Sequence, residues 1–106
     1  MNVPDKWVIV CATSNEFGQV YKVLGGWFGG YVDSEEWKLN SGIASFTETE
    51  DSYLFYGESG SVYKCYKQSE GFTSLTQSVF NRMQNTCKEH PGASMEIISA
   101  DYYTKP

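Results

Sequence analysis

The chain has 106 residues and a formal net charge of −5, with no run of Lys and Arg. This length suits a single domain, and the acidic balance argues against a protein that tracks nucleic-acid phosphates. The longest apolar run, residues 7–12, is far shorter than the roughly 18 residues of a membrane span. The first residues lack the apolar core of a signal peptide, and three cysteines, an odd number, fit a reducing compartment. We therefore expect a cytoplasmic protein that does not bind membranes.

The first half of the chain predicts two strands and an unusual glycine-rich segment. Residues 6–12 are apolar on both faces and predict a central strand. Residues 13–18 have the composition of a turn. Residues 19–24 fit either a helical spacing or an alternating one. Gly18 weakens a helix there and the Val-Tyr-Lys-Val run favours extension, so we predict a strand.

Residues 25–31 read Gly-Gly-Trp-Phe-Gly-Gly-Tyr, with four glycines around two bulky aromatic residues. One interpretation is a tight connection whose Trp27 and Phe28 fold back onto the sheet. The other is a flexible finger that presents Trp27, Phe28 and Tyr31 to a partner, because Trp and Tyr dominate binding hot spots. The acidic residues that follow, Asp33, Glu35 and Glu36, would form a polar rim around that finger. A second acidic group, at positions 48, 50 and 51, is interpreted as solvated turns or as a docking rim for a basic partner.

Short alternating segments follow and predict further strands. They cover residues 37–40, 43–49, 53–56 and 62–66, and together predict a β-meander over residues 37–67. The last two form a hairpin whose two faces are both rich in aromatic residues. We therefore expect either that the chain covers both faces, or that one face meets a partner.

One amphipathic helix is predicted at about residues 74–89. Ser74 and Gln77 fit a capping box, and Pro91-Gly92 ends the helix. An apolar stripe repeats every four residues, at Leu75, Val79, Met83 and Cys87. Residues 95–98 predict a last strand. The fold class is therefore α+β, a single domain over residues 1–106 with a five- or six-stranded, mainly antiparallel sheet and this helix packed on one face.

The sequence predicts no catalytic site, no metal site and no cofactor. The single histidine, His90, lies at the end of the predicted helix, where a surface or capping role is expected. Residues 57–61 resemble a nucleophile elbow but lack its final glycine and lie in a hairpin turn. The cysteines Cys11, Cys65 and Cys87 lie in apolar patterns, as core cysteines do. We therefore predict that the chain is not an enzyme.

The middle third of the chain resembles a family of small uncharacterised bacteriophage accessory proteins. The resemblance rests on Trp-Lys-Leu-Asn-Ser-Gly-Ile at residues 37–43, then Tyr-Leu-Phe-Tyr-Gly and Ser-Gly-Ser-Val-Tyr within residues 53–63. The first 36 residues show no clear match. The resemblance supplies no catalytic residues. It implies a protein that acts in a bacterial host cytoplasm and binds, redirects or blocks a host protein.

These observations lead to a non-enzymatic module that binds and inhibits or modifies a host protein, such as a defence, transcription or nuclease factor. The predicted contacts are Trp27, Phe28, Tyr31 and Trp37, with Glu35 and Glu36 as rim charges. The alternative hypothesis is an oligomeric sponge for a small ligand or signal nucleotide, which aromatic stacking would hold and on which the lysines at positions 22, 38, 64 and 67 would converge. No direct nucleic-acid partner is expected. A homo-oligomer is compatible with either hypothesis, since the second sheet face needs cover.

Overall fold

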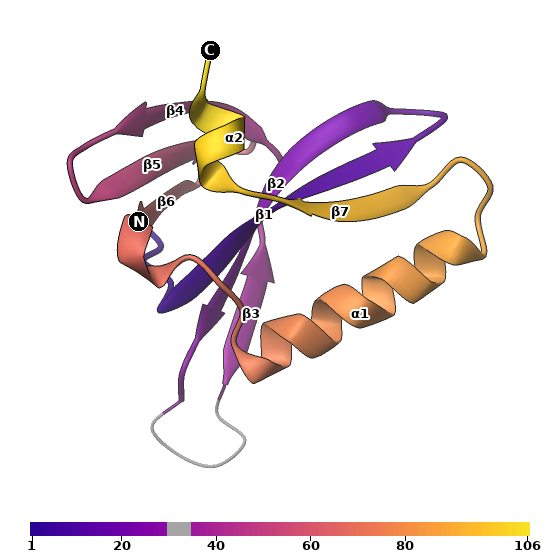
Figure 1. The fold of residues 1–106 in the computed structure, drawn as a ribbon, viewed down its shortest axis with the longest axis horizontal. Coiled ribbons are helices and arrows are strands. Elements are labelled where there is room, and N and C mark those ends of the chain that lie inside the picture. The colour runs from indigo at the N-terminus through magenta and orange to yellow at the C-terminus, as the bar shows by residue number, and fades with distance from the viewer. Residues whose placement is uncertain (30–34) are drawn as a thin grey trace.

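Seven strands form two antiparallel sheets in residues 1–29 and 35–106, the part of the chain that this computed structural model describes. The larger sheet has the order β3-β2-β1-β7 and the smaller one the order β4-β5-β6 (Figure 1). The strands are β1 (Lys6–Ser14), β2 (Gly18–Trp27), β3 (Glu36–Leu39), β4 (Ile43–Glu48), β5 (Ser52–Gly57), β6 (Val62–Tyr66) and β7 (Ser94–Ile98). The helices are α1 (Ser74–Lys88), α2 (Ala100–Thr104) and a short 3₁₀ turn, Lys67–Ser69. The α+β class is confirmed, while the single sheet of five or six strands is corrected to two sheets.

The predicted meander is divided between the two sheets at Asn40. The β3 strand pairs with β2, with Leu24 opposite Leu39, and only β4, β5 and β6 form the meander. The Asn40 N–H donates to the Val23 carbonyl at 3.0 Å, and Asn40 Oδ1 accepts from the Val23 N–H at 2.9 Å. Asn40 Oδ1 thus takes the place of the backbone carbonyl that would accept this hydrogen bond in a regular ladder, and β3 ends there. Gly42 follows at φ +147°, a conformation that favours glycine, and the chain passes to the second sheet.

The strand β1 lies inside the larger sheet and is buried on both faces, as predicted. Residues 19–24 belong to β2, which confirms the strand interpretation of that segment. On one face, Val8, Val10 and Leu24 pack against Phe80 of α1. On the other face, Trp7, Ile9 and Val23 pack against the smaller sheet. The larger sheet is therefore the middle of three layers, with α1 on one side and β4-β5-β6 on the other (Figure 1).

The helix α1 approaches the sheet most closely at its first turn. Its N-cap is Thr73, which forms a capping box with Thr76 in place of the predicted Ser74 and Gln77. Thr73 Oγ1 accepts from the Thr76 N–H at 3.1 Å, and Thr76 Oγ1 accepts from the Thr73 N–H at 2.8 Å. Both threonines are buried against Gly26, where an added Cβ would lie 2.8 Å from Thr76 Cγ2 and 2.9 Å from Thr73 Oγ1. Gly26 is therefore a packing glycine inside β2 and is not part of a loop.

The core between the two sheets is largely aromatic. Trp7 packs edge-on against Tyr53 at 6.0 Å between ring centroids and lies 5.8 Å from Phe55, and both tyrosine and phenylalanine come from β5. Trp7 Nε1 donates to the Tyr66 carbonyl at 2.8 Å, so its polar atom is satisfied in the interior. Tyr63 and Cys65 of β6 complete this buried face. The inner face of the predicted hairpin is thus covered within the chain.

The helix α2, which the sequence did not predict, closes the open end of this core. Ala100 is buried there, and Tyr103 packs against Tyr21, Phe46 and Phe55. The Ala100 N–H donates to Glu70 Oε2 at 2.9 Å, and Thr104 Oγ1 donates to the Ala100 carbonyl at 2.8 Å. A five-residue helix is marginal by itself, so these contacts hold it in place.

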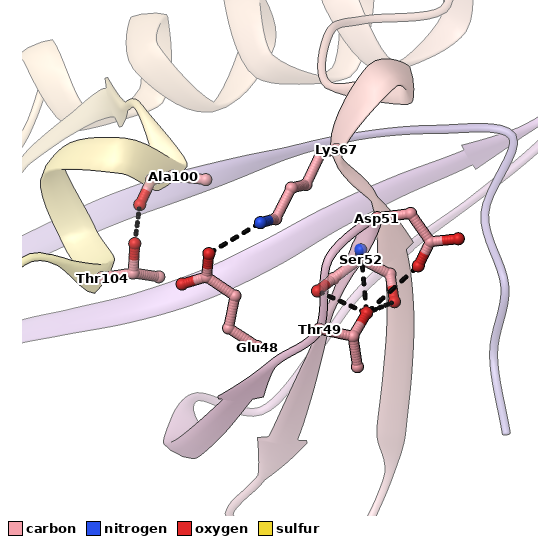
Figure 2. Close-up of polar contacts among 7 residues, drawn as sticks. All are labelled: Glu48, Thr49, Asp51, Ser52, Lys67, Ala100 and Thr104. Carbon is pink, nitrogen blue, oxygen red and sulfur yellow. Dashed lines mark hydrogen bonds and ion pairs between the residues drawn. The ribbon is translucent and has the colours of Figure 1, made fainter.

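The second acidic group lies near α2 in the turn between β4 and β5 (Figure 2). Glu48 pairs with Lys67 at 2.7 Å. Thr49 Oγ1 donates to Asp51 Oδ1 at 3.1 Å and interacts with Ser52 Oγ at 2.8 Å. Two of the three acidic residues therefore have partners within the chain, which favours the turn interpretation. Among the helices of the described residues, none has the length and apolar character to span a membrane.

Replacing Gly26 by alanine is expected to destabilise the fold by about 1–3 kcal/mol, because the new methyl group overpacks the first turn of α1. Chemical denaturation measures the loss. The Thr76→Ser change removes the nearest of the three atoms that the methyl group would meet, Thr76 Cγ2, while the hydroxyl group of the capping box stays. The double variant should therefore lose less than the sum of the two single changes. Strictly additive losses would contradict this close approach.

Alkaline pH is expected to destabilise the protein through its buried tyrosines. Burial raises the pKa of Tyr53, Tyr63 and Tyr103 above the ordinary value of about 10. The unfolded chain then loses these protons at lower pH than the folded chain. The free energy of unfolding should therefore fall as the pH rises above about 10. Tyr63→Phe should make this fall shallower in denaturation experiments.

Candidate protein-binding surface

Trp27, the first predicted contact, is held within the protein. It is the last residue of β2 and packs against the core between the sheets. Its Nε1 donates to the Val3 carbonyl at 3.0 Å, and Lys38 Nζ lies over its ring at 5.7 Å from the centroid. For Trp27 the structure matches the interpretation in which the residue folds back onto the sheet. A finger that begins at Trp27 does not fit these contacts.

Phe28 follows directly and is exposed, with 58% of its surface accessible. Its N–H donates to Asp5 Oδ2 at 2.8 Å, and two residues earlier the Gly26 carbonyl accepts from the Asp5 N–H at 2.9 Å. The Phe28 N–H and the Gly26 carbonyl both point toward the start of β1, so the alternation of backbone direction along β2 continues to Phe28. The Phe28 side chain therefore lies on the same side of the sheet as Gly26, the side that faces α1.

Trp37 lies on the same side, one strand away. It is opposite Gly26 in the β2–β3 register, and 42% of its surface is accessible. Glu36 is opposite Trp27, and both Glu35 and Glu36 are exposed. The structure thus brings Phe28, Trp37 and the two acidic residues to one end of the larger sheet. Tyr31 lies outside the described residues.

Trp37 also lines a groove of about 390 Å³ along α1. The other residues of the groove are Val79, Arg82, Met83, Thr86, Cys87 and Met95. We call Phe28, Trp37 and this groove the Phe28–Trp37 surface. Its lining is mainly apolar and Arg82 supplies a cation, a combination that is typical of protein contacts.

Sequence reasoning missed the α1 part of this surface. The predicted stripe of Leu75, Val79, Met83 and Cys87 was expected to face the core, yet only Val79 of these four is fully buried. Thr76, Val79 and Phe80 are the buried residues of α1, and Thr76 lies against Gly26.

The outer face of the smaller sheet is a second half-exposed aromatic region. Tyr56 and Tyr66 are partly buried there, and Lys64 Nζ lies 5.1 Å from the centroid of the Tyr66 ring. The Tyr56 hydroxyl lies 3.4 Å from Thr47 Oγ1. Each of these rings therefore has a polar group of the chain beside it.

The described residues contain no group of three or more His, Cys, Asp or Glu side chains that could hold a metal ion. His90 is exposed just beyond the end of α1. Cys11 and Cys65 are buried, and burial raises the pKa of the Cys65 thiol, which keeps it protonated and unreactive. This arrangement provides neither an activated nucleophile nor a general base beside one.

Three of the lysines that a small-ligand sponge would need have partners within the chain. Lys67 pairs with Glu48, Lys38 lies over Trp27, and Lys64 lies over Tyr66. Lys22 lines a hollow of about 290 Å³ near the β1–β2 turn, together with Glu58.

Cys87 is expected to be the one thiol that reacts in the folded protein, because it is half-buried in the groove while Cys11 and Cys65 are buried. A maleimide reagent at neutral pH should add one label per chain, detected by mass spectrometry. Cys87→Ser should abolish this labelling, and unfolding should restore reaction at the two buried thiols. Fast labelling of Cys11 or Cys65 in the native protein would contradict the described core.

Comparison with known proteins gave no significant match to a family model, to a curated protein or to a solved structure.

Proposed function

We propose that this chain is a non-catalytic binding module, a phage-type accessory protein that captures a bacterial host protein and blocks or redirects it. Contact is made through the Phe28–Trp37 surface, with Glu35 and Glu36 at its rim. The observation that carries the proposal is the exposure of Phe28 and Trp37 on the same side of one sheet, next to an apolar groove.

The distribution of aromatic residues supports this assignment. Four large aromatic side chains, those of Trp7, Tyr53, Phe55 and Tyr63, are buried between the two sheets. Phe28 and Trp37 remain accessible although each could bury a large apolar area in a partner. Apolar rings that are grouped at one end of a sheet and bordered by charges match the centre and rim of a protein interface.

The bacterial host is the context that the resemblance of residues 37–63 to phage accessory proteins implies. A protein that blocks a host factor has to bind that factor and does not have to catalyse a reaction. The missing catalytic arrangement in the described residues is compatible with that role, and the acidic net charge favours a partner with a basic surface near the contact.

Removing the two exposed rings is expected to abolish capture of the host protein. A tagged chain is used to purify partners from bacterial lysate, and the bound proteins are quantified by mass spectrometry. Phe28→Ala combined with Trp37→Ala should reduce affinity about 1,000-fold, because two anchors at the centre of an interface contribute about 2 kcal/mol each. Trp27 is left intact because its ring packs in the core.

Phe17→Ala is the matched control. Phe17 is 75% exposed, but it lies in the turn between β1 and β2, away from the Phe28–Trp37 surface. This variant should retain the same partner at the same yield. If the double variant still captures that partner equally well while the control does not, the contact lies elsewhere and the assignment is wrong.

A further inference from the structure

The two sheets have four edge strands, and on three of the edges a hydrogen bond or an irregularity hinders the addition of a further strand. Along β6, the Asn2 N–H donates to the Val62 carbonyl and the Asn2 carbonyl accepts from Lys64, both at 2.8 Å. Along β4, the pairing with β5 is interrupted by a register shift between Ile43 and Ser45, and bulges of this kind hinder edge pairing. Along β7, Gln84 Nε2 of α1 donates to the Met95 carbonyl at 3.0 Å.

The edge formed by β3 is different. Within the described residues β3 pairs only with β2. The backbone groups of Asn40 point toward β2, because its N–H donates to the Val23 carbonyl. Backbone direction alternates along a strand, so those of Lys38 and Glu36 also point toward β2. The N–H and C=O groups of Trp37 and Leu39 therefore point outward, away from the sheet.

The charges along β3 select one way of pairing with a second copy. Two identical antiparallel strands are related by a two-fold axis that passes through a pair of equivalent residues. An axis at Glu36 would place Glu36 opposite itself, and an axis at Lys38 would place Lys38 opposite itself. An axis at Trp37 instead places Glu36 of each copy opposite Lys38 of the other.

The same axis also satisfies the backbone. Trp37 has outward-pointing groups, so the two Trp37 residues would exchange two N–H···O=C hydrogen bonds. Glu36 and Lys38 would then form the non-hydrogen-bonded pairs, in which opposing side chains lie closest, with Cα atoms about 4.5 Å apart. Leu39 of one copy would face Glu35 of the other and continue the ladder. Of the axes at Glu36, Trp37 and Lys38, the one at Trp37 is thus the one that both charge and hydrogen bonding favour.

We propose that two copies of this chain pair through β3, antiparallel and with the two-fold axis at Trp37. The two larger sheets then join into one sheet of eight strands. Because the axis is perpendicular to that sheet, both α1 helices lie on the same face (Figure 1 shows one copy). The two Trp37 rings lie side by side on that face and join the two grooves into one apolar surface. This pairing goes beyond host binding and does not depend on it, since it is a property of the purified chain.

Charge reversal on β3 tests the pairing. Light scattering coupled to size-exclusion chromatography should give about 24 kDa for the wild-type chain, twice the 12.0 kDa of one copy. Glu36→Lys places two pairs of lysines in opposition, and Lys38→Glu places two pairs of glutamates in opposition. Each variant should weaken self-association at least about ten-fold and elute as a monomer. Both residues are exposed, and Lys38 Nζ also lies over the Trp27 ring and 3.4 Å from Asn2 Oδ1, so circular dichroism checks that each variant keeps the fold.

Two rescue experiments separate pairing from simple damage. The double variant E36K/K38E restores opposite charges across the axis and should be a dimer again. An equimolar mixture of the two single variants should form a heterodimer, because every lysine then faces a glutamate. Glu96→Lys on β7 is the matched control at the other edge of the larger sheet, and it should leave the dimer intact.

Specific results would overturn the proposal. A wild-type chain that stays monomeric at its highest soluble concentration would do so. So would dimers that persist in both single variants, or dimers that are lost only in Glu96→Lys. Host capture is measured separately from these outcomes, so the failure of either proposal is recognised independently of the other.

Discussion

The burial of β1 on both faces is the constraint on which the rest of this structure depends. Side chains alternate along the strand, so Trp7 and Ile9 face one way while Val8 and Val10 face the other, and all four are buried. A strand of this kind is stable only between two other layers. The smaller sheet covers the side of Trp7, and α1 covers the side of Val8. The strands β2, β3 and β7 extend the sheet of β1, and the remaining elements lie in these two covers.

The smaller sheet buries its face of the larger sheet more completely than α1 buries the other face, and this difference produces the candidate binding surface. The smaller sheet, with α2 at its end, seals one face with tightly packed rings such as Phe55 and Tyr103. A single helix covers the other face, and its first turn is drawn down onto Gly26. Farther along, Met83 and Cys87 remain half-buried above the sheet. Apolar surface is left open on the helix side and not on the side of the smaller sheet.

The sequence was sufficient for those features that depend on local pattern. The central strand, the β5–β6 hairpin and the extent of α1 all follow from periodicity and turn residues, and all three are confirmed. The division into two sheets depends on Asn40, whose side chain takes the place of a backbone group, and no periodic pattern encodes that role. The helix α2 has only five residues and exists because of tertiary contacts at Ala100 and Tyr103. Local propensity does not predict a feature that depends on tertiary packing alone.

For the candidate site, the same distinction separates Trp27 from its neighbours. Composition marks Trp27, Phe28 and Trp37 equally, and the glycines around the first two resemble a loop. The structure places Gly25, Gly26 and Trp27 inside β2 because they pair with β1 and β3. Burial then follows from parity, since Trp27 faces the aromatic core while Phe28 and Trp37 face the helix side, where α1 does not cover them.

The alternation along β3 also determines how Glu36 and Lys38 affect pairing at this edge of the sheet. Charged side chains on a short edge strand usually hinder pairing with other chains, and like charges would do so in every register. Opposite charges two residues apart behave differently. A two-fold axis at the residue between them places each charge of one copy opposite a charge of the other sign in the second copy. Trp37 occupies that position and has outward-pointing backbone groups. In the proposed pairing, the edge is therefore hindered in the two registers centred on a charged residue and favoured in the one centred on Trp37.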